Sequence, residues 1–264
     1  MLTAELVARA VAQAGIDSAP RFYESTGSTN TDLIDLGGAG APEWTVAVAN
    51  EQTAGRGRLG RTWESRRGLT LPVSVLLRPR VASSEVPLLS LAAGVAMAEA
   101  CRQAVAVEVR CKWPNDLVVG DRKLGGILTE ASVEGGVVAF AVIGTGVNLL
   151  HGRDDFPEDL RLPATSVALE GGDPDVEALL RAYLAGLREL YGEAGSALAT
   201  TAVSRYRPVC DTIGRRVRAQ TIGGEAVDGL AVGVGERGEL LVQTEGGGTE
   251  RVAFGEVEHL DWGS

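Results

Sequence analysis

The fold of this chain is decided by the stretch VEVRCKWPNDLVVGDRKLGGILTEASVEGGVVAFAVIGTGVNLL, residues 107–150. Apolar runs rich in Val and Ile alternate there with short turns that contain Gly, Pro, Asn or Asp. This pattern predicts four consecutive strands with tight connections, over 107–113, 116–120, 123–133 and 137–150.

The regions on either side add further strands and several helices. Three upstream strands are predicted at 21–26, 45–51 and 69–77; Pro72 cannot donate a ladder hydrogen bond, so we expect an edge or a bulge there. Apolar residues at helical spacing predict helices over 3–14 (with Thr3 as N-cap), 28–36, 84–104, 175–191 and 196–206. This order of elements indicates an α/β domain over residues 1–211.

The composition changes near residue 212. From there to residue 264, short alternating strands recur about every ten residues, with turns at Gly223-Gly224, Glu236-Arg237-Gly238 and Gly246-Gly247-Gly248. This spacing is typical of a small antiparallel barrel. We therefore expect two domains, 1–211 and 212–264.

Charge and composition exclude several classes of protein. The 264 residues carry 25 Lys and Arg against 35 Asp and Glu, a net charge of −10, which argues against a non-specific nucleic-acid binder. No apolar run approaches a membrane span, and the start lacks the pattern of a secretory signal. Three scattered cysteines fit reduced cytoplasmic thiols, so a cytoplasmic location is expected. We interpret His151 and His259 as structural or exposed residues.

The first chemical candidate is QTAGRGRLGRTW, residues 52–63. Seven arginines against two acids between 51 and 80 give a local charge of +5. Glycine lets backbone N–H groups approach an anion closely, and arginine adds forked charged donors, so the segment resembles an anion-binding loop. Trp63 could stack on a ligand or cover it. The alternative is a solvated basic turn.

The second candidate contains both lysines of the chain. Lys112 begins KWPND and Lys123 begins KLGGI, while all 23 other basic residues are Arg. Asp116 is close enough in sequence to pair with a lysine, bind Mg²⁺ or accept a proton. A hairpin of 116–119 with 122–130 would place both lysines at neighbouring strand ends. The alternative is a polar hairpin with surface salt bridges.

Two weaker signals complete the set. Ser28, Thr29 and Asn30 stand at a strand-to-helix junction, where such residues more often cap a helix than bind a ligand. The segment from Gly144 to Asn148 ends a buried strand, and a GxG turn alone is weak evidence for a ligand site.

Taken together and in this order, these segments resemble the biotin protein ligase family. The matching stretches are STN at 28–30, QTAGRGRLGRTW at 52–63, KWPND at 112–116, RKLGGIL at 122–128 and GTGVN at 144–148. The resemblance implies an α+β fold with a mixed β-sheet flanked by helices, followed by a small SH3-like β-barrel. It also implies that biotin and ATP, with Mg²⁺, form biotinyl-5′-AMP. A lysine of a biotin carboxyl carrier protein domain of an acyl-CoA carboxylase then receives the biotin.

The resemblance assigns roles by motif. The implied biotin-binding residues are Ser28, Thr29, Asn30, Gln52, Arg56, Gly57, Arg58, Lys123, Gly125 and Gly126. The implied nucleotide-binding residues are Arg56, Arg58, Arg61, Trp63, Lys112, Asn115 and Asn148. The implied catalytic residues are Lys123, Arg58, Lys112 and Asp116, with Asp116 also the candidate Mg²⁺ ligand. Among these, Lys123 is the strongest candidate for catalysis.

Two alternatives stay open. A lipoate or octanoate ligase or transferase shares the catalytic fold and a single essential lysine. The segment at residues 52–63 (the Gly–Arg loop) and the barrel nevertheless favour biotin. A non-catalytic biotin-binding module is disfavoured because Lys112, Asp116 and Lys123 are all present. Only about twenty residues precede the strand at 21–26, too few for a winged-helix domain, so no DNA binding is expected. A homodimer is permitted by the hydrophobic strands, and residues 151–163 are predicted to be a mobile loop.

Overall fold

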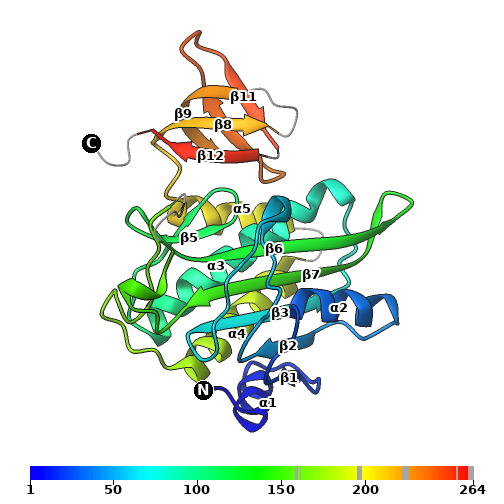
Figure 1. Ribbon diagram of the computed structural model, residues 1–264. Helices are drawn as coiled ribbons and strands as arrows, with labels where there is room; N and C mark the ends of the chain where they lie inside the picture. The colour runs from blue at the N-terminus through cyan, green and yellow to red at the C-terminus, as the bar shows by residue number, and fades with distance from the viewer. Residues whose placement is uncertain (158–159, 161, 195–197, 222–225, 254, 261–264) are drawn as a thin grey trace.

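A mixed seven-stranded sheet forms the centre of the larger domain (Figure 1). The structure, a computed structural model, describes residues 1–157, 160, 162–194, 198–221, 226–253 and 255–260. The strand order is β1-β2-β3-β7-β6-β5-β4, in which β1 and β2 are parallel and the other neighbours antiparallel. The strands are β1 (Arg21–Tyr23), β2 (Thr45–Ala49), β3 (Thr70–Leu77), β4 (Arg110–Lys112), β5 (Asp116–Val119), β6 (Arg122–Glu134) and β7 (Val137–Asn148).

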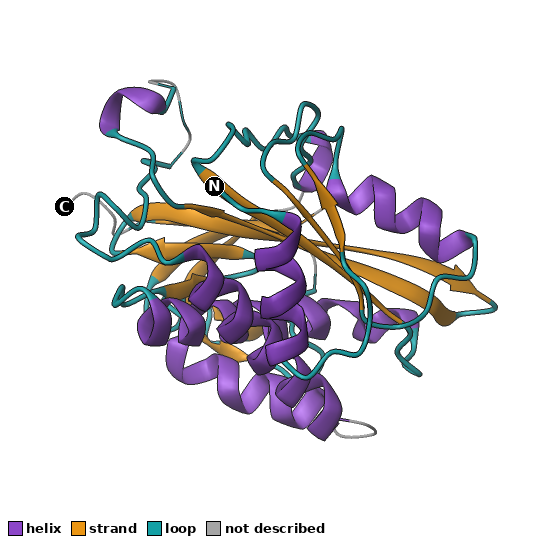
Figure 2. Ribbon diagram, turned by 90° about the horizontal axis from the view of Figure 1, so that it is seen from below, coloured by secondary structure: helices purple, strands orange, loops and turns teal. Residues whose placement is uncertain are grey.

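Among the described residues, five α-helices accompany the sheet, and most lie on one face of it (Figure 2). They are α1 (Ala4–Gln13), α2 (Thr29–Gly38), α3 (Val86–Ala104), α4 (Val176–Ala194) and α5 (Leu198–Val209), with short 3₁₀ turns at Arg58–Gly60, Ser83–Glu85 and Arg153–Asp155. Each predicted helix is confirmed within a few residues, and Thr3 caps α1 by accepting a hydrogen bond from Leu6 N. The α+β fold class is therefore confirmed.

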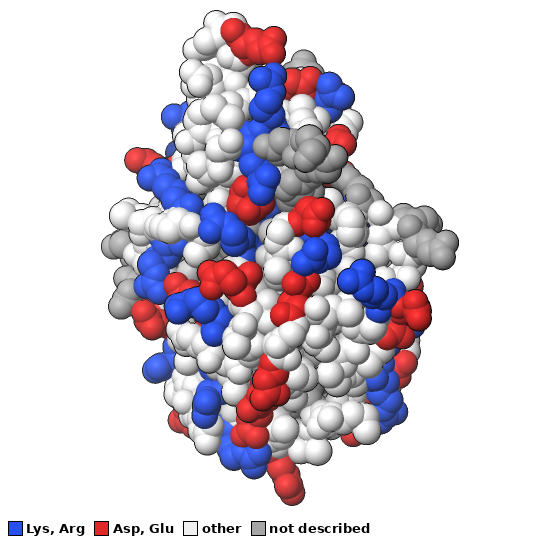
Figure 3. Space-filling view, turned by 90° about the vertical axis from the view of Figure 1, so that its left-hand side faces the viewer, with Lys and Arg blue, Asp and Glu red and all other residues white. Residues whose placement is uncertain are grey.

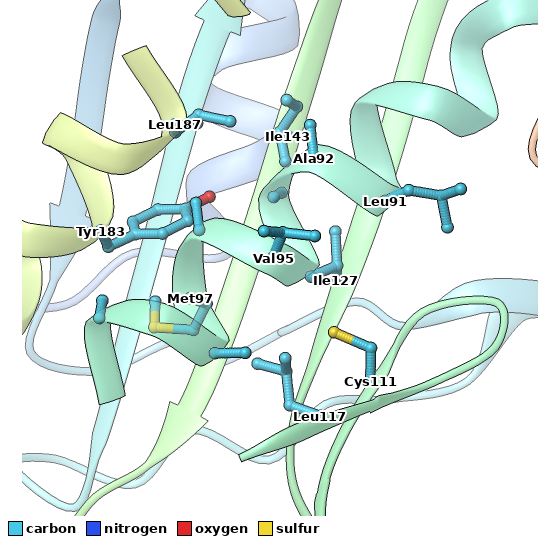
Figure 4. Packing of buried hydrophobic residues seen from close by; sticks show 14 of the residues in the cluster. Leu91, Ala92, Val95, Met97, Cys111, Leu117, Ile127, Ile143, Tyr183 and Leu187 are labelled. Atoms are coloured by element: carbon cyan, nitrogen blue, oxygen red, sulfur yellow. The ribbon is translucent and has the colours of Figure 1, made fainter. Parts of the chain in front are cut away.

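The apolar residues of the central strands point alternately to two clusters. On one face, Leu76 packs with Leu33 of α2, Phe140 and Val142. On the other face, the strands pack against α3, where Val95, Ile127, Ile143 and Tyr183 meet (Figure 4). Burial on both faces explains why the strand sequences are nearly continuous apolar runs.

Pro72 was expected at a strand edge or a bulge, and β3 has an edge there only on the side that faces β2. It pairs with Gly146 of β7, but it lies one residue beyond Val73, the last β3 residue paired with β2. At Pro72, β3 therefore has a ladder partner in β7 but none in β2.

Helix α3 corrects one sequence-based expectation. No apolar run of membrane-spanning length was expected from the sequence. Among the described helices, however, the segment Ser83–Ala104 is the one long and apolar enough to cross a membrane by length and composition. Within the fold, 67% of its most apolar window is buried. The helix packs against the sheet, α4 and α5. Its apolar character is therefore explained by its central position in the larger domain.

The C-terminal domain is a five-stranded antiparallel sheet, in agreement with the small β-domain expected there. Its order is β11-β10-β9-β8-β12, with β8 (Arg216–Thr221), β9 (Ala226–Val234), β10 (Leu240–Gln243), β11 (Thr249–Val252) and β12 (Gly255–His259). The predicted turn at Gly223-Gly224 lies outside the described residues. Buried Trp113 joins the two domains, because its Nε1 donates to Gly238 O (2.8 Å) and its backbone N–H to Thr212 Oγ1 (3.0 Å).

Candidate active site

A cavity of about 600 Å³ opens where the sheet, the Gly–Arg loop, the segment after β7 and strand β12 meet. Every site residue predicted from the sequence lines this cavity except Gly125. The lining set from the prediction is Ser28, Thr29, Asn30, Gln52, Arg56, Gly57, Arg58, Arg61, Trp63, Lys112, Asn115, Asp116, Lys123, Gly126 and Asn148. Segments far apart in the chain are therefore brought together in one site.

Gly125 is the exception. A Cβ at this position would lie 2.4 Å from Gly146 O on the neighbouring strand. Glycine is thus required for the close approach of β6 and β7.

Lys123 and Asp116 form an ion pair inside the cavity. The predicted hairpin is present, with Asp116 opposite Gly126 and Val118 opposite Lys123. Lys123 Nζ lies 2.5 Å from Asp116 Oδ1, and the side chains are 30% and 17% exposed. A Cβ on Gly126 would lie 3.6 Å from Lys123 Nζ. Glycine at 126 therefore keeps the space beside the pair open.

Lys112 occupies a different environment from Lys123. Its side chain is buried, and its Nζ donates to Val257 O of β12 at 2.5 Å. The ammonium therefore connects the larger domain to the C-terminal domain at the wall of the cavity. Lys112 lies on β4 and Lys123 on β6, on either side of β5, and the two ammonium groups contact different partners.

The backbone of the Gly–Arg loop is folded on itself. Trp63 N donates to Gly55 O (2.9 Å) and Gly57 N to Arg61 O (2.8 Å). A Cβ on Gly55 would lie 2.3 Å from Trp63 O, so glycine is needed there. Leu59 has a positive φ of 55° and is 60% exposed. The loop is thus ordered by its own backbone hydrogen bonds.

The arginines of the loop contact three separate elements. Arg56 pairs with Glu130 of β6, and Arg61 with Glu256 of β12. Arg58 donates to two neutral acceptors, Asn115 Oδ1 (3.1 Å) and Gly255 O (3.4 Å). Burial lowers the pKa of the Arg58 guanidinium.

The positive charge expected for residues 51–80 is partly neutralised by acidic side chains from outside this segment. Besides Glu130 and Glu256, Asp155 pairs with Arg66, and Glu24 pairs with Arg67. On the face seen in Figure 3, Lys and Arg side chains are accordingly interspersed with Asp and Glu. The local charge of +5 overstated the positive field of the site, because it ignored partners brought in by the fold.

Ser28, Thr29 and Asn30 line the cavity at the start of α2 and offer neutral polar groups to it. Ser28 is the N-cap residue of α2, but its side chain makes no capping hydrogen bond. Instead Thr29 N donates to Gln52 Oε1 at 2.9 Å. The α2 N-terminus is therefore joined to the Gly–Arg loop.

The GTGVN segment at the end of β7 shapes the same wall. A Cβ on Gly144 would lie 2.1 Å from Asn30 Oδ1, and one on Gly146 would lie 2.7 Å from the Trp63 ring. Both glycines are needed because these side chains press on the strand backbone. Asn148 is buried and donates to Thr165 O at 3.0 Å.

Several lining residues had no usable signal in the sequence. Ser74, Glu256 and the two rings of His151 and Phe156 all line the cavity. His151 is buried against Phe156, with ring centroids 4.8 Å apart, and burial lowers its pKa so that it is neutral at pH 7. A lone histidine in a polar stretch does not predict this position.

The described residues could support a magnesium ion only in part. They contain no group of three His, Cys, Asp or Glu side chains suited to a metal. Asp116 contributes one carboxylate to the cavity. Mg²⁺ commonly takes one or two carboxylates together with substrate phosphates and water, so Asp116 fits such a shared ion but not an all-protein site.

The fold and site define a ligase of the biotin and lipoate type. Residues 22–148 match the "Biotin/lipoate A/B protein ligase family" and residues 212–260 the "Biotin protein ligase C terminal domain". The chain belongs to the biotin protein ligase family.

Individual relatives support this membership. The chain is 36% identical to the biotin–[acetyl-CoA-carboxylase] ligase of Mycobacterium tuberculosis over 245 residues, covering 89% of this chain and 86% of that protein. It is 33% identical to the bifunctional ligase/repressor BirA of Bacillus subtilis, over 86% of this chain and 70% of that protein. Among solved structures, the biotin protein ligase of Aquifex aeolicus in complex with biotin and ATP matches with a TM-score of 0.74 and 26% identity, over 90% and 97% of the two chains.

Proposed function

We propose that this protein attaches biotin to one lysine of a biotin carboxyl carrier protein domain of an acyl-CoA carboxylase, in two steps through biotinyl-5′-AMP. The observation that carries the proposal is the Lys123–Asp116 pair, set in a cavity lined by both neutral polar and cationic side chains. Both the biotin–ATP complex of the Aquifex relative and the family assignment support it. We place the boundary between its two domains at residues 211 and 212.

The first step joins two anionic groups. An oxygen of the biotin carboxylate attacks the α-phosphorus of ATP, the bond from that phosphorus to the bridging oxygen breaks, and pyrophosphate leaves. Thr29, Asn30 and Ser74 offer amide and hydroxyl groups, which suit an uncharged ureido ring. Arg58 and Lys123 are cationic donors, which suit the carboxylate and phosphates.

Lys123 is the proposed catalytic group of this step. Its ammonium reduces the repulsion between carboxylate and phosphate and stabilises charge that develops on the phosphoryl oxygens. Asp116 positions the ammonium through the 2.5 Å contact. Arg58 adds a second cation, desolvated by burial. Asp116 would hold Mg²⁺, and the ion would supply further charge neutralisation.

The second step transfers biotin to the carrier. The lysine amine of the carrier, having lost its proton, attacks the carbonyl carbon of the mixed anhydride, and AMP leaves with the electron pair of the broken carbon–oxygen bond. Asp116 is the proposed proton acceptor because it lies in the same cavity as Lys123. We further propose that residues 151–157, which line the cavity through His151 and Phe156, shield the adenylate from water.

The test is pyrophosphate exchange into ATP with biotin and lipoate measured side by side, followed by transfer to a carrier domain. The proposal predicts biotin-dependent exchange, and transfer that is lost when the acceptor lysine of the carrier is replaced by arginine. Exchange with lipoate but not biotin would identify the lipoate-type alternative. Biotin binding without exchange would identify a binding module. Sedimentation of the same sample tests the permitted homodimer.

A further inference from the structure

A ring of polar contacts leaves the Gly–Arg loop, crosses the sheet and returns to the loop. It starts and ends only four residues apart in sequence, at Gln52 and Arg56. The members of this polar ring, in order, are Gln52, Thr29, Ser74, Asn30, Glu130 and Arg56.

The first half of the polar ring consists of uncharged groups. Gln52 Oε1 accepts from Thr29 N (2.9 Å) and lies 3.0 Å from Thr29 Oγ1. Thr29 Oγ1 lies 2.7 Å from Ser74 Oγ, and Ser74 Oγ donates to Asn30 Oδ1 at 2.7 Å. Since the Ser74 hydroxyl gives its one proton to Asn30, the contact with Thr29 uses the Thr29 hydroxyl proton, and Gln52 Oε1 is held by the backbone N–H of Thr29.

The second half of the polar ring passes through Glu130. Asn30 Nδ2 donates to Leu128 O (3.2 Å) and to Glu130 Oε2 (3.1 Å). Arg56 binds the same carboxylate, with Nη2 2.8 Å from Oε1 and Nη1 3.2 Å from Oε2. An ionised carboxylate, which only accepts hydrogen bonds, satisfies Asn30 and Arg56 at once.

Glu130 itself does not belong to the cavity wall, whereas Asn30 and Arg56 do. Its side chain is 24% exposed, and it extends from β6, the strand that also carries Lys123. Its carboxylate thus lies behind the wall and fixes the carboxamide orientation of Asn30 and the position of the loop arginine.

We propose that Glu130 is a positioning residue for the biotin end of the site, acting through Asn30 and Arg56. The inference rests on the proposed function, which places the biotin ring against the polar ring. It assigns the residue a role in substrate affinity rather than in the chemical step, because Glu130 contacts Asn30 and Arg56, whereas the proposed reacting groups meet at Lys123.

The test is the Glu130→Gln variant, which keeps the shape of the side chain. Its carboxamide oxygen can still accept from Asn30 Nδ2 and Arg56 Nη1, but the negative charge is lost and an N–H donor then faces Arg56 Nη2. We expect the Kd for biotin, measured by titration calorimetry, to rise about tenfold. The KM for ATP and the kcat of biotin-dependent exchange should stay within about twofold at saturating biotin, because a group that contributes equally to ground and transition states alters KM alone.

The matched control is Glu177→Gln, which removes a two-bond pair with Arg9 on exposed surface. A double variant, Arg56→Ala with Glu130→Gln, tests the mechanism, since the second change should weaken binding much less once Arg56 is absent. Glu130→Asp keeps the charge and should recover part of the affinity.

The outcomes separate the inference from the proposed function. If the wild-type protein binds no biotin, the proposed function fails. If it binds biotin and Glu130→Gln binds within about twofold of it, the inference is overturned while the proposed function stands. A variant that loses melting temperature beyond the Glu177→Gln control, and weakens ATP and biotin alike, would show a merely structural role and also overturn it.

Discussion

Replacing Lys123 by methionine removes the ammonium while keeping most of the side-chain bulk. The variant leaves Asp116, whose side chain is 17% exposed, without its partner at 2.5 Å. Removing one member of a fully buried ion pair costs about 3–5 kcal/mol, and we expect about 1–3 kcal/mol here because Lys123 is 30% exposed. The loss should appear in urea unfolding.

A second variant separates this cost from catalysis. Adding Asp116→Asn to Lys123→Met removes the unpaired carboxylate and should restore stability to within about 1 kcal/mol of the wild type. It should not restore activity, because the missing charge would have stabilised the transition state of adenylation. Loss of one such electrostatic contact costs about 10²–10³-fold in rate.

The assay is biotin-dependent pyrophosphate exchange on both variants, together with their unfolding curves. The expected result is a stability recovered by the double variant and an exchange rate that stays at least about a hundredfold below wild type. An exchange rate within about tenfold of wild type in Lys123→Met would refute the role given to Lys123.

Three further predictions address other parts of the site. Lys112→Met leaves Val257 O without its donor and should lower the free energy of unfolding by about 1–3 kcal/mol, with a smaller loss of exchange than Lys123→Met; an equal loss would show that Lys112 acts in the chemistry. Gly144→Ala brings a Cβ within 2.1 Å of Asn30 Oδ1 and should weaken biotin binding at least about tenfold, whereas the control Gly233→Ala, with its nearest contact at 3.7 Å, should not. Burial lowers the pKa of His259 to about 3, so below about pH 6.5 the unfolded chain binds a proton that the folded chain does not. The free energy of unfolding should therefore fall from about pH 6.5 toward pH 3 by up to about 1.4 kcal/mol per pH unit, measured as the difference between the wild type and His259→Gln. A difference with no such slope would contradict the lowered pKa.

The sequence predicted the elements and most of the site because their signals are local. Strand alternation, helical spacing and the Gly–Arg and Lys–Gly–Gly motifs are each contained in a short segment. The hairpin that carries Asp116 and Lys123 was predicted from turn chemistry alone, and the structure confirms it. The cavity then gathers these motifs because their strands are neighbours in one sheet.

The misses have a common physical cause, which is that a local pattern carries no information on distant partners. Glu130 and Glu256 neutralise loop arginines from 74 and 195 residues away in the chain. Nothing in the local sequence of Gly125 indicates that Gly146 O approaches it from the next strand. Likewise, the sequence around Ser28 does not indicate that Gln52 accepts a hydrogen bond from the α2 N-terminus.

The most direct test of the central claim is pyrophosphate exchange by the purified protein with biotin and with lipoate as the acid. The account predicts exchange that requires biotin and is lost in the Asp116→Asn, Lys123→Met double variant, although that variant remains folded. Exchange supported by lipoate alone, or biotin-dependent exchange of wild-type rate in the double variant, would contradict it.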